Sequence, residues 1–236
     1  MQNFSKLKIV IGLIYLAIVT LVVILFFYYG ANSFLDLNFL KNNKDQIFAF
    51  RDANFVLLAI SYFFFSIVWV FLLGFGTPLV IVAGFAFGIF WGSFLSILGF
   101  SIGASLLYLF ANHYFKDLVF KYLAVRFLSL KNHFNENEFG YFFFVRVIPG
   151  IPFPIKNVMP VLFNMKVKNY FFATLLGESV PIIISISVVS GFANSIETNA
   201  NLDFTILYDP KIFIPLLMLG CLIILSNFVK KKYFDK

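Results

Sequence analysis

Four polar side chains interrupt apolar segments in the second half of this chain, and they are the residues best suited to chemistry. Arg146, Lys156 and Asn157 lie in the segment FVRVIPGIPFPIKNVMP, and Glu178 lies in a later apolar run. If these segments lie in a membrane, each charge at its centre costs at least about 2.5–3.5 kcal/mol and needs a partner or a wet cavity. The two cations would attract a phosphate, and Asn157 would donate hydrogen bonds to it.

Glu178 is open to two interpretations, and so is Arg146. Glu178 is the candidate partner of Arg146 or Lys156 in an ion pair, which would be a purely structural role, and it is equally a candidate proton site. Arg146 either faces an internal cavity or extends its side chain to the membrane surface.

The composition is that of an integral membrane protein. Hydrophobic residues make up 61% of the 236 residues and charged residues only 12%, whereas a soluble domain carries about a quarter charged residues. No Asp, Glu, Lys or Arg occurs from Ala53 to Phe115. Because a helical crossing takes about 20 apolar residues, that stretch alone is long enough for more than one.

Five segments have the length and hydropathy of a membrane crossing, namely 9–29, 54–73, 92–111, 169–192 and 212–229. We therefore predict an all-α integral membrane fold of about five to six transmembrane helices. Basic residues near both ends favour a cytoplasmic location for both termini, which requires an even number of crossings. Either one broken segment crosses fully, or one terminus departs from the charge rule.

The chain divides into three predicted parts. Residues 1–35 form an N-terminal anchor helix, residues 36–195 form the central domain, and residues 196–236 hold an acidic loop, the last transmembrane helix and a basic tail. Within the central domain, residues 116–134 mix apolar and basic side chains, which predicts a helix lying at the membrane surface.

The first broken segment is residues 74–92. Pro78 disfavours helix at the residue before it, so a helix should end near that point. Gly84, Gly88 and Gly92 then follow at intervals of four, which predicts one small-residue face that allows close helix contact. Ordinary helix packing is the alternative to a special role for these glycines.

The second broken segment is residues 141–164, whose four prolines include Pro149 and Pro152 and exclude a continuous helix. Backbone at membrane depth without helical hydrogen bonds must be buried in protein or line a wet cavity. Gly177 and Pro181 flank the later carboxylate and predict a kink in the helix that carries it. These glycines and prolines are the candidate structural residues of the two hairpins.

The two broken segments correspond in sequence. Pro78 lies six residues before Gly84, Pro154 lies six residues before Pro160, and an apolar span follows each pair. Corresponding broken segments in two halves indicate a binding site between inverted repeats.

A set of glycines, prolines and polar residues carries a resemblance to a known family, namely Pro78, residues 83–92, Gly99, residues 103–104, residues 144–153, Asn157, Gly177 and Pro181. On these residues the chain, from about Leu40 to Asn194, resembles the VTT-domain family, also called the DedA-like or SNARE-associated Golgi protein family. The resemblance implies two re-entrant hairpins that face each other from opposite sides of the membrane. It also implies lipid scrambling, as in eukaryotic members, or recycling of polyprenyl-phosphate carriers, as in bacterial members. Two departures are Val161, where many bacterial members have Gly, and the absence of acidic residues in the first hairpin.

The leading functional hypothesis is translocation of a phosphate-bearing lipid between leaflets, with Arg146, Lys156 and Asn157 binding the phosphate. The alternatives are a proton-coupled small-solute transporter in which Glu178 carries the proton, and a scaffold that transports nothing. The sequence has no zinc-binding pattern and no nucleophile–base constellation, which predicts no metal, no cofactor and no enzyme. Membrane lipids are the predicted partners and nucleic acid is not. No particular oligomeric state is indicated, and the predicted location is a bacterial plasma membrane.

Overall fold

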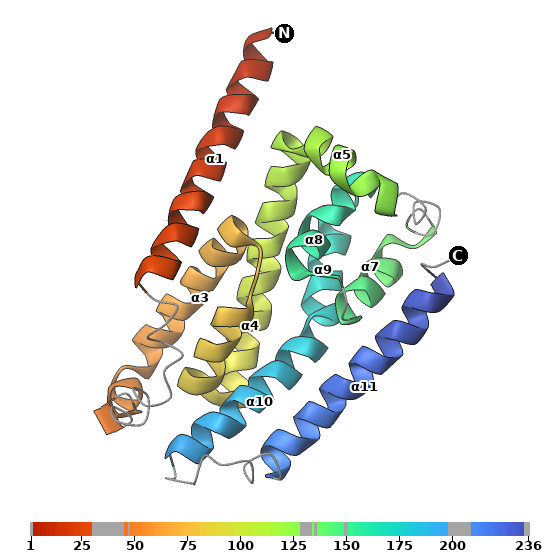
Figure 1. Ribbon diagram of the computed structural model, residues 1–236. Helices are drawn as coiled ribbons and strands as arrows, with labels where there is room; N and C mark the ends of the chain where they lie inside the picture. The colour runs from red at the N-terminus through yellow and green to blue at the C-terminus, as the bar shows by residue number, and fades with distance from the viewer. Residues whose placement is uncertain are drawn as a thin grey trace.

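The computed structural model describes residues 2–29, 45–46, 48–127, 134, 136–148, 151–197 and 209–233. Over this part of the chain it is helical and contains no strand, which confirms the predicted all-α class (Figure 1). The main elements are α1 (Gln2–Tyr29), α3 (Phe55–Leu73), α4 (Thr77–Tyr114), α5 (Lys116–Phe127), α7 (Glu138–Val147), α8 (Phe153–Val158), the 3₁₀ helix η2 (Met159–Phe163), α9 (Val167–Gly177), α10 (Ser179–Glu197) and α11 (Pro210–Tyr233). Pro149, part of the predicted surface helix and most of the acidic loop lie outside the described residues.

Four of the five predicted crossing segments fall on one helix each, and segment 169–192 falls on α9 and α10, with Glu178 between them. Among the described residues, three helices are long and apolar enough to cross a membrane, namely Phe55–Leu73, Thr77–Tyr114 and Val167–Ile196. The apolar parts of the first and last helices, Val10–Leu25 and Pro210–Cys221, are shorter.

The first half of the central region begins with a helical hairpin. The helix α3 ends where residues 74–76 turn, and residues 77–87 then run back along it. Tyr62 donates a hydrogen bond to the carbonyl of Leu79 (3.1 Å), and the rings of Phe55 and Phe87 lie 5.7 Å apart. The residue number falls along one arm and rises along the other from the first pair to the second, so the two arms are antiparallel.

A second reversal occurs at Gly88, inside the element α4. Its backbone angles, φ 67° and ψ −166°, lie in a region that is essentially restricted to glycine. A Cβ added at Gly92 would lie only 2.7 Å from the carbonyl oxygen of Ala83, whereas nine residues of straight helix rise about 13 Å. The chain therefore folds back, and residues 89–114 form a separate long helix.

The prediction that Gly84, Gly88 and Gly92 share one helix face is wrong, because the helix breaks at Gly88. Gly84 faces α10, where an added Cβ would lie 2.6 Å from Val189. At Gly88 the nearest atom would be Ser190 Oγ, at 3.8 Å. Gly84 and Gly92 thus allow close packing of helices, whereas Gly88 adopts the positive-φ conformation that reverses the chain.

We expect Gly84→Leu to destabilise the protein by at least about 1–3 kcal/mol, because the added side chain overpacks the contact with α10. Thermal unfolding in detergent measures the loss. Gly220→Leu is the matched control, since nothing lies within 4 Å of a Cβ added there. Gly12 is unsuitable as a control because Phe115 would lie 2.8 Å away. Equal unfolding temperatures for the two leucine variants would contradict the close packing.

The second half repeats this design. Residues 153–163, which comprise α8 and η2, are as long as residues 77–87, and Pro154 takes the place of Pro78 at the second position. Each of these segments ends at a residue with positive φ, namely Gly88 (φ 67°) and Asn164 (φ 51°). A long helical stretch follows in both halves, which agrees with the predicted internal repeat.

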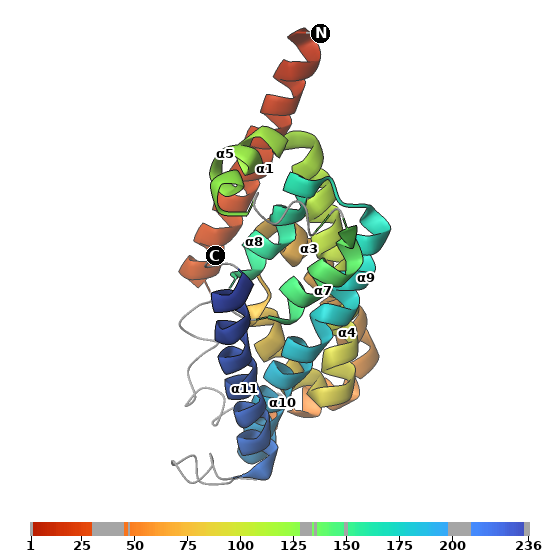
Figure 2. The ribbon, with the colours of Figure 1, turned by 90° about the vertical axis from the view of Figure 1, so that its right-hand side faces the viewer.

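The two halves run in opposite directions (Figures 1 and 2). After Gly88 the helix α4 ascends in Figure 1, whereas α9 and α10 descend. The helices α1 and α11 also run in opposite directions. The N-terminal end of α1 and the C-terminal end of α11 therefore point toward the same side, where α5 lies across the end of α4.

The predicted anchor helix α1 packs on the first half through Tyr15. Its hydroxyl donates to the carbonyls of Phe71 and Leu72, each at 2.8 Å, at the last turn of α3. Its ring lies 4.7 Å from that of Phe110. These contacts satisfy terminal carbonyls of α3 and attach α1 to the central region.

Candidate functional site

Arg146 is fully buried in the last turn of α7 and is surrounded by hydrogen-bond acceptors. Its Nη1 donates to Asn157 Oδ1 at 2.8 Å and to Glu178 Oε1 at 3.4 Å, and its Nη2 donates to the Tyr170 hydroxyl at 2.7 Å. The guanidinium carbon lies 4.7 Å from the centre of the Phe142 ring, a distance at which aromatic rings attract cations. The structure thus places Arg146 inside the protein and not at a membrane surface.

Lys156 is the second buried cation of the site, with 5% of its surface exposed. Its Nζ donates to the carbonyl of Arg146 at 2.8 Å and lies 3.6 Å from Glu178 Oε1. Arg146, Lys156, Asn157 and Glu178, which the sequence singled out, therefore form one cluster. Since two cations face one carboxylate, the cluster carries a formal charge of +1.

Asn157 connects this cluster to the first half of the protein. Its Nδ2 donates to the carbonyl oxygen of Gly74 at 3.1 Å. Gly74 adopts a left-handed conformation with φ 70° at the end of α3, and a Cβ added there would lie 3.5 Å from Pro154 Cβ. The turn after α3 and the helix α8 therefore meet beside the charged cluster.

The predicted structural residues around Glu178 lie at a helix junction. The helix α9 ends at Gly177 and α10 begins at Ser179, with Glu178 between them. Pro181 lies in the first turn of α10, where a missing N–H is tolerated. Gly177 packs on Arg146, and an added Cβ would lie 2.5 Å from Arg146 Cβ. The predicted interruption at Glu178 is present in the structure.

A proline lies at the start of each of the two short segments, residues 77–87 and 153–163. Pro78 is the second residue of α4, and Pro152 directly precedes α8 with φ −54°. Proline is favoured at such positions because its N–H would have no helical acceptor. Pro78 and Pro152 therefore lie at the starts of these two short segments.

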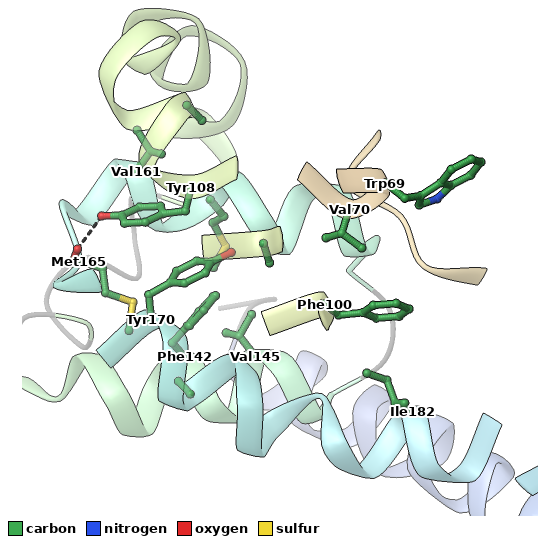
Figure 3. Packing of buried hydrophobic residues seen from close by; sticks show 14 of the residues in the cluster. Trp69, Val70, Phe100, Tyr108, Phe142, Val145, Val161, Met165, Tyr170 and Ile182 are labelled. Atoms are coloured by element: carbon green, nitrogen blue, oxygen red, sulfur yellow. Dashed lines mark hydrogen bonds between the residues drawn. The ribbon is translucent and has the colours of Figure 1, made fainter. Parts of the chain in front are cut away.

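Tyr170 is a central residue of the site that the sequence did not reveal. Its hydroxyl accepts from Arg146 and donates to the carbonyl of Asn157 at 3.1 Å. Figure 3 shows its ring between those of Tyr108 and Phe142, with centroids 4.6 Å and 5.0 Å away. Since 21% of the chain is aromatic, one tyrosine in an apolar run carries no signal of its own.

The first half contains an apolar counterpart of Arg146. Gly177 packs on Arg146 and on the carbonyl of Phe143, which lies three positions before Arg146. Gly103 packs in the same manner on Val70 and on the carbonyl of Ile67, which lies three positions before Val70. Val70 and Arg146 are both fully buried. The same helix contact therefore forms in one half around valine and in the other around arginine.

Other members of the cluster also have apolar counterparts. The shift that relates Pro78 to Pro154 relates Val80 to Lys156, and Ala104 directly follows Gly103 as Glu178 follows Gly177. Ala104 is fully buried. The first half therefore adopts the repeated architecture with apolar side chains at the positions that are charged in the second half.

In the part of the chain that the structure describes, these features define an all-α integral membrane protein with an internal repeat and a buried charged cluster. The family model of the VTT domain matches residues 74–191, half of the chain, and the chain belongs to this family. The match begins at the tip of the first hairpin, ends in α10 and includes the whole cluster. The family resemblance seen in the sequence is confirmed.

Relatives of the chain occur in animals and bacteria. Transmembrane protein 41B of Gallus gallus is 28% identical over 144 residues, which cover 58% of this chain and 52% of the relative. The Homo sapiens protein of the same name is also 28% identical, with 48% of its length covered. Uncharacterized protein YqeD of Bacillus subtilis is 30% identical over 118 residues, 47% of this chain and 55% of the relative. The chain thus spans about half the length of these relatives, and no solved structure gives a significant match.

Proposed function

We propose that this protein translocates a phosphate-bearing lipid, either a phospholipid or a polyprenyl phosphate, between the leaflets of a membrane. Arg146 and Lys156 attract the phosphate, and Asn157 donates a hydrogen bond to it. A non-transporting scaffold and a proton-coupled solute transporter are the competing functions.

The observation that carries the proposal is a buried excess of positive charge at a position that is apolar in the other half of the protein. The cluster has a formal charge of +1 in an apolar interior, where an unbalanced charge is strongly unfavourable. Val70 occupies the position equivalent to Arg146 and is equally buried. The positive charge of Arg146 is replaced by an apolar side chain in the other half, and Glu178 alone does not neutralise the two cations. Such a charge is suited to binding an anion.

Admission of a head group requires the hairpin tips to separate. The cluster is closed in this conformation, because Arg146 and Asn157 have no exposed surface. The turn after α3 touches α8 through the hydrogen bond from Asn157 to Gly74 and the packing of Gly74 on Pro154. Separation of these two segments would free Asn157 to bind the phosphate.

The arrangement of the helices supports a specific membrane topology. The helix α1, residues 89–114, α9 with α10, and α11 are the four crossings, while the two hairpins enter from opposite sides. Here α3 is one arm of a hairpin and not a crossing of its own. The even number places both ends of the chain on the side of α5, which the basic residues at both ends assign to the cytoplasm. We place the protein in the plasma membrane of a bacterium.

Lipid exchange in vesicles tests the proposed function. We expect vesicles that contain the purified protein and a fluorescent phospholipid to lose nearly all fluorescence on addition of dithionite, because inner-leaflet lipid reaches the outer leaflet. Protein-free vesicles should lose about half. A loss equal to that of protein-free vesicles, for phospholipid and polyprenyl phosphate alike, would favour the scaffold.

A further inference from the structure

Two buried polar atoms, one in the cluster and one on α9 nearby, form no hydrogen bond of regular geometry. Arg146 Nε and Thr174 Oγ1 are among the few such side-chain atoms in the described part of the chain. Both residues are fully buried. The Thr174 hydroxyl lies close enough to the Tyr170 phenol to interact with it, but it forms no hydrogen bond of regular geometry. Buried polar groups are nearly always satisfied, so each exception requires an explanation.

Helix geometry places Thr174 on the side of α9 that packs against Arg146. Tyr170, Thr174 and Gly177 share one face of α9, since residues four and seven apart lie on one side of a helix. Gly177 packs on Arg146 Cβ, and Tyr170 contacts Nη2 at the far end of the side chain. Thr174 lies between these two residues on the same face, so helix geometry directs its side chain toward Arg146.

The guanidinium presents two edges, and the structure uses them differently. Nη1 is occupied by Asn157 and Glu178. The other edge, formed by Nε and Nη2, has a single partner, the hydroxyl of Tyr170. Two adjacent N–H groups of arginine match two oxygens of a phosphate or carboxylate.

We infer that the Nε edge of Arg146 and the hydroxyl of Thr174 form an oxyanion subsite that takes a phosphate group. One phosphate oxygen accepts from Nε and from Thr174, and a second accepts from Nη2. The Tyr170 hydroxyl occupies the place of this second oxygen in the closed conformation. The assignment to a lipid phosphate rests on the proposed function, whereas the subsite itself would equally bind free phosphate.

The first half again shows that packing does not require this polar group. Thr174 lies three residues before Gly177, and Phe100 lies three residues before Gly103. Phe100 is 2% exposed and belongs to the apolar core. A buried apolar side chain therefore occupies the corresponding position in the other repeat, and the hydroxyl of Thr174 is available for a ligand.

Thermal unfolding of the purified protein in detergent tests the subsite. The added ligands are inorganic phosphate, compared with chloride at equal ionic strength, and dihexanoylphosphatidylglycerol, compared with dihexanoylglycerol. A ligand that binds the folded state raises the unfolding temperature. We expect phosphate or the phospholipid to raise it, and Thr174→Val to require about tenfold more of that ligand, since a hydrogen bond to a charged group is lost.

Three variants make this experiment decisive. Thr174→Ser retains the hydroxyl and should bind as the unaltered protein does, whereas Thr20→Val removes an exposed hydroxyl that bonds within α1 and should change nothing. Stabilisation by free phosphate identifies a general oxyanion site, and stabilisation by the phospholipid alone identifies a lipid site. Equal stabilisation of the protein and of Thr174→Val, or none by either ligand, overturns the inference.

The two proposals fail separately. Lipid exchange in vesicles without phosphate binding that depends on Thr174 leaves the translocase function intact and refutes the subsite. Phosphate binding that depends on Thr174, in a protein that exchanges no lipid, retains the subsite and refutes translocation.

Discussion

The variant Arg146→Val is expected to insert and fold like the unaltered protein and to exchange lipid about 100-fold more slowly, as the loss of a buried charge contact of about 3 kcal/mol implies. Removal of the guanidinium leaves Lys156 and Glu178, which lie 3.6 Å apart and balance each other's charge. The cluster then has a formal charge of zero and no longer attracts an anion.

Folding should survive this change for two reasons. Val70 forms the same buried contact with Gly103 that Arg146 forms with Gly177, so valine suits the local packing. A charge that is unfavourable in the membrane is also removed. Thermal unfolding and membrane yield measure stability, and dithionite quenching measures exchange.

Arg51→Val is the control for loss of a positive charge. Arg51 forms a surface ion pair with Asp52, whose side chain is 67% exposed, through a 2.8 Å contact. The same guanidinium holds the pKa of Asp52 below its ordinary value. This variant should exchange lipid at the unaltered rate. If Arg146→Val fails to accumulate in the membrane, the charge is a structural requirement and the binding assignment is wrong.

The members of the charged cluster could be predicted from the sequence because charges in apolar segments are rare and must find partners. Arg146 and Glu178 are 32 positions apart, yet each was conspicuous in its own segment. The contact between Asn157 and Gly74 could not be predicted, since its acceptor is a backbone carbonyl that any residue would supply. Tyr170 was hidden for a related reason, because its ring resembles the many other aromatic side chains.

The glycine pattern shows why spacing alone was insufficient for the fold. Three glycines at intervals of four indicate a common face only if the helix is continuous. Gly88 interrupts that helix, and its positive φ is a property of the folded backbone that spacing does not encode. The corresponding prolines of the two halves were more informative, because proline constrains the backbone locally wherever it occurs.

Glu178→Gln is expected to destabilise the protein by about 3–5 kcal/mol, the usual effect of removing one partner from a buried ion pair. Glu178 lies 3.4 Å from Arg146 Nη1 and 3.6 Å from Lys156 Nζ. Its neutralisation leaves two buried cations without an anion and raises the formal charge of the cluster from +1 to +2. Thermal unfolding in detergent measures this loss.

A double variant separates the ion-pair role of Glu178 from a proton-carrying role. Arg146→Val combined with Glu178→Gln returns the cluster to +1, so it should recover much of the stability lost in Glu178→Gln alone. The contacts of Glu178 with two cations, at 3.4 Å and 3.6 Å, have the geometry of an ion pair and favour the ion-pair role. Under that role, lipid exchange in the unaltered protein is insensitive to an imposed pH gradient. Exchange that follows the gradient in the unaltered protein but ignores it in Glu178→Gln would instead identify Glu178 as the proton carrier.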